Sequence, residues 1–358
     1  MANPASLQQT SDFCEVLTQR IDAYFNDNDL SIKGDWRMAL KIVAAMAGWA
    51  ATILPVYLFE LTHVQVFLMY MLHGAAQLYL MLNISHDANH KAISRRPLVN
   101  KVLSYTFDLC GINSFVWRTI HLRAHHYCIN IYGEDENIDG QGLMRLTPDA
   151  PRKAFHKYQH FYAYFLYCLY ILDLILYKDF QFFFLPKKYL NEVKIPAREY
   201  VILFIGKIFY LGYMIALPIF VLDLPVWLVL VAFFLAQFLL SFVAIIVLQI
   251  THINEVGGFP KAKNQFEHFI YHVLASTADY SRSNPLANWF FGGLHIHAIH
   301  HIRPHVCHMH FPELTKILRT TASEYGVQYR ESKTTVQAWR KHRRFLKQLG
   351  QTDLSVPG

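Results

Sequence analysis

Charged residues are scarce in this chain. Only 16% of its 358 residues are Asp, Glu, Lys or Arg, whereas 53% are hydrophobic. A typical soluble domain carries about 25% charged residues. Phenylalanine and tyrosine are abundant, at 27 and 21 residues, as in proteins with aromatic belts at membrane interfaces. The composition therefore argues against a soluble protein and favours an integral membrane protein.

Cysteine is equally sparse. The five cysteines show no Cys-x-x-Cys or zinc-ribbon spacing, which argues against a zinc ribbon and predicts free thiols in a reducing compartment. The first 33 residues are polar and lack the apolar core of a signal peptide. No His-Pro-Gly-Gly turn of the kind found in cytochrome-like haem modules is present. The cysteines are Cys14, Cys110, Cys128, Cys168 and Cys307.

A basic stripe interleaved with aromatic residues is also missing, although the net charge is +7. The chain is therefore not predicted to bind nucleic acid. A basic cytoplasmic face beside anionic lipid explains the sign of the charge more simply.

Long apolar segments predict an all-α integral membrane protein with four transmembrane helices. The turns near Glu60 and Asp223 carry no Lys or Arg, so two hairpins are expected to enter from the cytoplasm, with both termini cytoplasmic. The apolar segment 161–177 is short and is expected to lie in the interface or re-enter. His73 and Gln77 lie one turn apart, and a structural hydrogen bond is favoured over a ligand role for His73. The predicted spans are 39–59, 63–83, 200–222 and 226–250.

The domain organisation follows from these spans. Residues 1–38 are predicted to be a cytoplasmic N-terminal segment, residues 39–330 a membrane domain with a cytoplasmic helical cap, and residues 331–358 a basic C-terminal tail. A bacterial inner membrane and the endoplasmic reticulum are both compatible with this arrangement.

Histidines gather in three clusters outside the predicted spans. The first comprises His86 and His90, the second His121, His125 and His126, and the third His297, His300 and His301, with His295 beside them. Helical spacing of three or four residues places the members of each cluster on one face. Another histidine, His252, directly follows the fourth span, and all of these histidines fall on one predicted side of the membrane. The nine candidate ligands are His86, His90, His121, His125, His126, His252, His297, His300 and His301.

Nine imidazoles exceed the six ligands of one metal ion, so the clusters predict two metals. Imidazole suits iron, zinc, copper and nickel. No His-Glu-x-x-His zinc-protease motif is present, and no carboxylate is spaced to complete a two-His-one-carboxylate triad. A site rich in neutral nitrogen ligands fits two irons that activate oxygen.

Five segments together resemble the membrane fatty-acid desaturase family, most closely its acyl-lipid and linoleoyl-CoA desaturase-like branch. The likeness covers about residues 83–318. It is carried by NISHDANH at 83–90, HHYCINIYGED at 125–135, KYQH at 157–160 with Tyr162, His252 with Glu255 and Phe259-Pro260, and NWFFGGL at 288–294. The resemblance implies a four-span, mushroom-like helical fold, a non-haem di-iron site and acyl-chain oxidation.

The third histidine cluster departs from the branch pattern. That pattern commonly reads Gln-Ile-Glu-His-His, whereas His297 stands at the Gln position and Ile299 at the Glu position. Histidine is usual there in other desaturase branches, so metal binding should survive. The Gln is typical of enzymes that act near the carboxyl end of the acyl chain, so the position of the double bond stays open. His295, His305, His308 and His310 are not assigned as ligands.

The expected function is O2-dependent introduction of a double bond into an acyl chain carried on a lipid or on CoA. Because the sequence shows no flavin, haem or iron–sulphur motif, electrons must come from a ferredoxin or cytochrome b5 type donor. A basic face could dock such a donor or contact lipid headgroups equally well; it comprises Arg95, Arg96, Lys187 and Lys188. Groups that could orient the ligand imidazoles are Asp87, Asn130, Asp135 and Glu255.

Other functions remain open at this point. A hydroxylase, epoxygenase or acetylenase could use the same scaffold. A histidine-rich metal transporter would place its ligands in mid-span, and a bis-histidine membrane haem protein would pair histidines inside facing helices. Only His73 is placed in that way.

Overall fold

The computed structural model describes residues 4–185, 193–255, 258–262, 265–266 and 268–351. It is mostly helical, and the chain divides into two compact units. Unit 1 comprises Met1–Asp35, His121–Ala163 and Val247–Gly358, and unit 2 comprises Trp36–Ile120 and Tyr164–Ile246.

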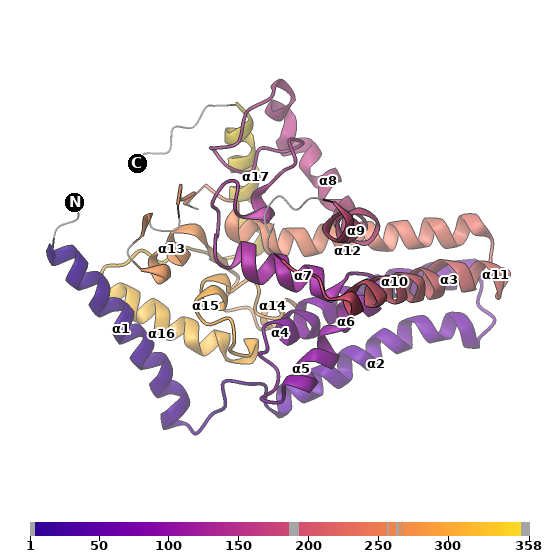
Figure 1. Cartoon of the computed structure of the whole chain (residues 1–358), viewed down its shortest axis with the longest axis horizontal. Helices are drawn as coiled ribbons and strands as arrows, with labels where there is room; N and C mark the ends of the chain where they lie inside the picture. The colour runs from indigo at the N-terminus through magenta and orange to yellow at the C-terminus, as the bar shows by residue number, and fades with distance from the viewer. Residues whose placement is uncertain (1–3, 186–192, 256–257, 263–264, 267, 352–358) are drawn as a thin grey trace. The chain divides into compact units, whose positions relative to one another are not determined.

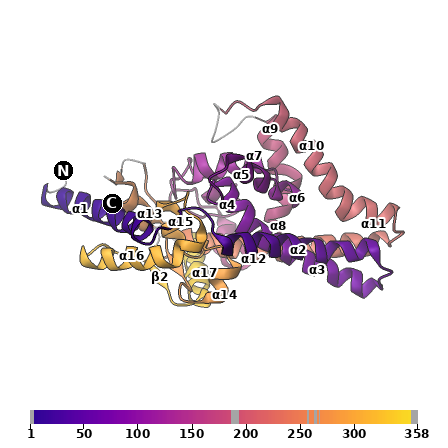
Figure 2. The same ribbon diagram turned by 90° about the horizontal axis from the view of Figure 1, so that it is seen from below.

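Unit 2 begins with an antiparallel helical hairpin, α2 (Trp36–Leu58) and α3 (His63–Leu80). Figures 1 and 2 both show the two helices side by side. A capping box starts α3, because the Thr62 side chain accepts a hydrogen bond from the Gln65 backbone while the Gln65 side chain accepts one from the Thr62 backbone. This cap fixes the tight turn that the sequence places near Glu60.

The helix α3 does not stop where its apolar residues end. It continues through the π-helical turn η1 (Met81–Ser85) into α4 (His86–Asn89), so the first histidine cluster lies at the end of an unbroken helical path. Three short helices follow: α5 (Pro97–Ser104), α6 (Thr106–Leu109) and α7 (Ser114–Ile120).

The second predicted hairpin is also present. Its first arm comprises α10 (Ala197–Leu211), the π-helical turn η6 (Gly212–Ala216) and α11 (Leu217–Phe220), and its second arm is α12 (Val226–His252). The predicted boundaries of the four spans agree with these helices to within a few residues.

The segment around 161–177 is longer than the sequence analysis expected. It belongs to a continuous path through η4 (Ala154–Tyr158), α8 (Gln159–Asp173), the π-helical turn η5 (Leu174–Lys178) and α9 (Asp179–Phe184). The prediction of a short helix over residues 161–177 is wrong, because helical backbone hydrogen bonding continues beyond these apolar residues at both ends. By length and composition, five helices in the described residues could cross a membrane: Trp36–Leu58, His63–Asn89, Ala154–Phe184, Ala197–Phe220 and Val226–His252.

His73 is buried in unit 2 and takes part in a hydrogen-bond network. Its Nδ1 lies 3.0 Å from Thr52 Oγ1, and Gln77 Nε2 lies 3.3 Å from its Nε2 and 3.1 Å from the Tyr213 hydroxyl. Burying polar groups in an apolar bundle is costly unless they bond one another. The prediction of a structural hydrogen bond for His73 is confirmed.

The core of unit 1 contains an N-terminal helix that the polar composition of this region concealed. Helix α1 (Pro4–Asp27) buries Phe13, Leu17, Ile21 and Phe25, which recur every four residues and form one face. This face packs with α13 (Phe269–Ser276), α15 (His297–Ile302) and α16 (Phe311–Glu324). Figures 1 and 2 show α1 lying along α16.

A small parallel strand pair, not expected for an all-α protein, joins two distant parts of unit 1. Strand β1 (Asp279–Tyr280) pairs with β2 (Glu331–Ser332), and helix α17 (Thr335–Gln351) follows. The described part of the segment predicted as a basic tail is therefore folded and belongs to unit 1. The remaining elements of unit 1 are η2 (His121–His125), η3 (Glu136–Ile138), α14 (Pro285–Phe290) and η8 (His308–His310).

Candidate metal centre

The second histidine cluster lies on a π-helical turn rather than on a regular α-helix. The His126 backbone N–H donates to the His121 carbonyl five residues earlier, and the Nε2 atoms of these two residues lie 3.1 Å apart. Sequence spacing alone predicts that His121 pairs with His125, four residues later. Because the π turn contains one more residue than an α turn, it brings position i+5 opposite position i and releases His125 toward other partners.

Four buried imidazoles of unit 1 converge on one point. His252 Nε2 lies 2.7 Å from His297 Nε2, and His301 Nε2 lies 3.1 Å from the same atom. The His125 ring centroid lies 4.7 Å from that of His252. One ligand atom from each residue lies within 4.8 Å of those of the other three, and we call this set the first imidazole group: His125, His252, His297 and His301.

Three further imidazoles of unit 1 form a second imidazole group: His121, His126 and His300. His126 Nε2 lies 3.1 Å from His121 Nε2 and 3.1 Å from His300 Nε2. The two groups are adjacent, because ligand atoms of His126, His300 and His301 also lie within 4.8 Å of one another. All seven predicted ligands of unit 1 therefore come together in two neighbouring groups.

The tautomers of two rings show why the first group suits a cation. His297 Nδ1 lies 2.8 Å from the Leu294 carbonyl oxygen, which can only accept, so Nδ1 carries the proton and Nε2 presents a lone pair. His125 Nδ1 donates to the Asp135 carboxylate in the same way. Burial and the neighbouring histidines hold the pKa of His301 well below its usual value, so that ring is neutral at pH 7. The unprotonated Nε2 atoms of His297 and His125 thus offer neutral nitrogen lone pairs within a buried imidazole cluster, and this donor set fits a transition metal.

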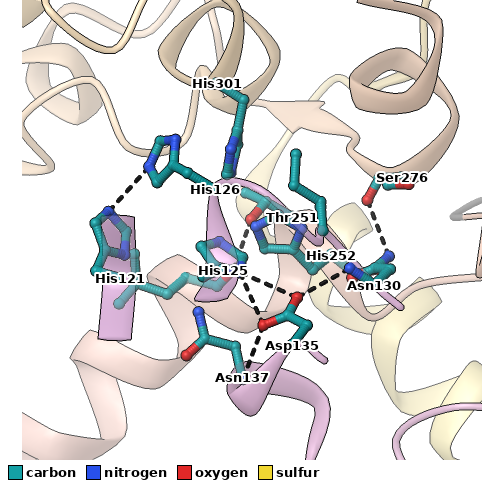
Figure 3. A network of polar contacts seen from close by, with 12 residues as sticks. His121, His125, His126, Asn130, Asp135, Asn137, Thr251, His252, Ser276 and His301 are labelled. Carbon is teal, nitrogen blue, oxygen red and sulfur yellow. Dashed lines mark hydrogen bonds and ion pairs between the residues drawn. The ribbon is translucent and has the colours of Figure 1, made fainter. Parts of the chain in front are cut away.

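Asp135 holds His125 in place. Both carboxylate oxygens lie 3.1 Å from His125 Nδ1, and they also accept from the Asn130 and Asn137 backbone N–H groups at 2.9 Å. Figure 3 shows the fully buried carboxylate between the ring and the turn that follows the second histidine cluster. A carboxylate on the far ring nitrogen fixes the tautomer and increases the basicity of the ligating nitrogen.

Asn130 connects the second histidine cluster to the end of α12. It adopts the left-handed conformation with φ of 57°, and its side-chain nitrogen lies within hydrogen-bonding distance of the carbonyl oxygens of His252, Gly258 and Ser276 at 3.3, 3.0 and 3.1 Å. Asn130 therefore positions backbone segments rather than an imidazole directly.

Asp279 is a buried residue of the site that the sequence analysis did not identify. Its Oδ1 accepts from the His297 and Ala298 backbone N–H groups at 2.7 and 2.9 Å, and its Oδ2 accepts from the Tyr329 hydroxyl. The carboxylate thus caps α15, the helix that carries three of the candidate ligands, and this cap comes from a strand 18 residues upstream. Local sequence gave no signal, because the pairing depends on the tertiary fold.

His86 and His90 lie together in unit 2. Both are buried, and their ring centroids are 4.6 Å apart, as the four-residue spacing predicts. Asp87 Oδ1 lies 3.4 Å from His86 Nδ1, and the Trp117 ring packs edge-on against His86 at 5.6 Å. Asp87 therefore lies beside the ring of one candidate ligand, His86.

The remaining candidates have other partners. Glu255 Oε1 accepts from Arg344 at 2.8 Å, and His295 Nε2 bonds Asn288 at 2.8 Å. Of the basic residues suggested as a docking face, Arg95 and Arg96 are exposed. Lys187 and Lys188 lie outside the described residues.

Comparison with known proteins gives a consistent result. A family model described as fatty acid desaturase matches residues 61–333. The chain is 30% identical to an sn-1 linoleoyl-lipid 6-desaturase of Synechocystis sp. over 96% of both proteins, and 29% identical to one of Arthrospira platensis over 94% of this chain and 92% of that protein. It is 28% identical to an acyl-lipid (8-3)-desaturase of Physcomitrium patens over 98% of this chain and 74% of that protein. Matched over most of its length, the chain belongs to the fatty acid desaturase family, and it is an oxidoreductase that introduces a double bond into an acyl chain.

Proposed function

We propose that the enzyme binds two iron ions through its nine candidate histidines and desaturates acyl chains of membrane lipids. The observation that carries the proposal is the convergence of four buried imidazoles whose ligand atoms lie within 4.8 Å of one another. When bound, the irons supply the oxygen-dependent oxidation that removes hydrogen from two neighbouring methylenes. The protein supplies the ligands of the irons, orients the acyl chain beside them and provides a site from which water is excluded.

The first imidazole group would hold one iron and the second group would contribute to the other. The assignment of His86 and His90 to the di-iron site rests on their spacing and on the family resemblance. Asp135 and Asp87 would orient His125 and His86 through their Nδ1 atoms. Asn130 and Glu255 would act more remotely, by fixing the backbone at His252 and after it.

The names of the relatives favour a lipid-bound substrate. Two of them are linoleoyl-lipid 6-desaturases, and a third is an acyl-lipid (8-3)-desaturase. We therefore propose an acyl group carried on a membrane lipid rather than on CoA. His297 stands at a position where the branch commonly has Gln, so the position of the new double bond has to be mapped directly.

The proposed arrangement in the membrane is four spans in two hairpins, with a helical cap and both termini in the cytoplasm. The distribution of Lys and Arg supports it, since the turns near Glu60 and Asp223 lack both. The Ala154–Phe184 helix would then lie in the interface. The membrane would be a bacterial inner membrane or the endoplasmic reticulum, and a ferredoxin or cytochrome b5 type protein would donate electrons.

Expression in a host with defined lipids, followed by double-bond mapping of every acyl class, tests the proposal. A new double bond should appear first in lipid-bound acyl groups, and a first appearance in acyl-CoA would contradict the proposed carrier. An oxygen atom retained in the product would indicate hydroxylation or epoxidation instead. The matched variants are His300→Ala, which should lose both bound iron and product, and His305→Ala, which should keep both. Unchanged iron and product in His300→Ala would contradict the metal assignment.

A further inference from the structure

The outer face of α17 carries positive charge only. The helix contains five cations and no Asp or Glu, and three of the cations recur at positions i, i+3 and i+7 on one exposed face: Arg340, Arg343 and Lys347. The opposite face is buried in unit 1 and includes Ala338, His342, Phe345 and Leu349. Such a division of faces is typical of a surface helix whose apolar stripe packs on the core, and it leaves the basic face of α17 available to an anionic partner.

The helix is held rigidly, so this basic face cannot turn inward. Gln159 Nε2 donates to the Leu346 carbonyl at 2.7 Å, and Arg145 donates to the Leu349 carbonyl at 2.8 Å. At Gly350 an added Cβ would come within 2.0 Å of the His156 carbonyl oxygen, so the end of α17 lies directly on the backbone of η4 (Figure 1).

The segment against which α17 packs is the start of the Ala154–Phe184 helix, which is long and apolar enough for a membrane. Exposed cations lie just before this helix, at Arg152 and Lys153, and in its first turn, at Lys157, and the sequence has no acidic residue from 150 to 172. The start of such a helix is expected at the level of the lipid headgroups, whether the helix crosses the bilayer or lies along it.

Exposed aromatic rings lie among these cations. Phe155, Tyr158 and Phe161 are 43%, 55% and 62% exposed. The Arg343 guanidinium lies 5.6 Å from the Phe161 ring centroid, and Lys157 Nζ lies 4.8 Å from that of Tyr158. Aromatic rings beside cations are typical of the zone where acyl chains meet headgroups, whereas a surface that docks a protein only by charge needs no exposed rings.

We propose that this surface, the lipid-facing patch formed by Arg152, Lys153, Lys157, Arg340, Arg343 and Lys347 with the three rings, binds the phosphate groups of anionic phospholipids in the surrounding membrane. The patch anchors unit 1 to the bilayer. This proposal depends on the membrane location of the protein and not on the identity of its metal or substrate.

The test measures the thermal stability of the purified full-length protein in neutral detergent micelles to which dioleoyl phosphatidylglycerol or phosphatidylcholine is added. Phosphatidylglycerol should raise the Tm of the wild type, and phosphatidylcholine should not. One cation near an anionic surface corresponds to about a fivefold change in affinity. The double variant Arg343→Gln with Lys347→Gln should therefore need about 25-fold more phosphatidylglycerol for the same shift.

The matched control is Lys261→Gln with Lys316→Gln, which removes two exposed cations of unit 1 outside the patch. It should respond to phosphatidylglycerol like the wild type. A wild-type response in the patch variant would overturn the proposal. So would a patch variant whose only defect is a higher KM for an acidic electron-donor protein, because the surface would then be a protein docking site.

Salt provides a second measurement that needs no variant. The Debye length falls to about 3 Å at 1 M ionic strength, so the response of the wild type to phosphatidylglycerol should largely disappear there. A response to phosphatidylglycerol that is insensitive to salt would show that acyl-chain contacts cause it, and would overturn the assignment to headgroup phosphates.

Discussion

Asp135 bonds to the ring of a candidate ligand, His125, and to two backbone N–H groups at the same time. One carboxylate therefore fixes both His125 and the turn after the second histidine cluster. An amide in its place has only one acceptor oxygen, and its NH2 group would face donors. Replacing Asp135 should therefore leave all the candidate ligands in the site but orient His125 less firmly.

Asp135→Asn should reduce iron affinity by about 10- to 100-fold while the protein still folds. The measurement is iron per protein after dialysis against a graded series of chelator concentrations. Asp149→Asn, which changes an exposed carboxylate of the same unit, is the control. Equal iron retention in the two variants would exclude a role for Asp135 in holding the metal.

A second acidic residue, Asp108 of unit 2, predicts a pH effect unrelated to the imidazole groups. Burial raises its pKa to about 7, with a smaller contribution from Asp179, while the Ser114 hydrogen bonds and Lys207 act in the opposite direction. In the unfolded chain the pKa is about 3.9. The folded state thus favours the protonated carboxyl, and the resulting stability is complete below pH 4 and lost as pH rises through about 7.

Asp108→Asn should therefore have a Tm close to that of the wild type at pH 4 and a higher Tm at pH 8.5. Thermal unfolding in detergent at the two pH values measures this. The neutral amide removes the cost of ionising a buried carboxyl but keeps the shape of the side chain. A variant that is less stable than the wild type at pH 8.5 would show that ionised Asp108 stabilises the fold through Lys207.

Among the elements, those with a uniform apolar sequence were predicted most accurately. The helices α2 and α12 lie where the hydropathy of the sequence predicts them. An apolar segment of this length is accommodated most simply as one long helix. The Ala154–Phe184 helix was underestimated, since its first turn is polar and a π-helical turn interrupts it without ending it. Helix α1 was not predicted, because polar residues separate its four buried apolar residues and keep the mean hydropathy of the segment low.

Leu17→Ala on α1 should destabilise unit 1 by about 2–5 kcal/mol, because Leu17 is fully buried against the core that includes α15 and α16. Hydrogen exchange should rise in α1 and α16, and the Tm should fall. The exposed Gln19→Ala on the same helix is the control. If exchange rises only in α1, the helix is an independent arm and does not support the ligand-bearing core.

At the scale of the whole molecule, the sequence predicted which histidines come together better than how they are grouped. All seven candidate ligands of unit 1 lie in the two imidazole groups, as expected of histidines at helical spacing that serve one site. Their division into two groups could not be predicted, since it depends on the π turn at His121. Asp279 could not be found either, because its cap on α15 spans two chain segments that meet only in the fold.

Removing iron should therefore destabilise the imidazole groups of unit 1 more than the α2–α3 hairpin of unit 2. Without a cation, the buried lone pairs of His125 and His297 lose the partner proposed for them, and metal-binding energy that would add to the stability of the fold is lost. Treating the protein with a chelator should lower the Tm and increase hydrogen exchange at residues 121–135 and 297–301. Exchange in the α2–α3 hairpin should stay unchanged, because its buried bonds, such as His73 to Thr52, involve no candidate ligand.

Adding Fe(II) back to the chelated protein should restore both the Tm and the exchange pattern. The control is the Asp135→Asn variant, which should need a higher Fe(II) concentration for the same recovery because His125 is less well oriented. Uniform loosening of both units on chelation would mean that the metal stabilises the molecule as a whole. No change at residues 121–135 would mean that the imidazoles of unit 1 hold their arrangement without a metal, and the lone-pair argument for the site would then fail.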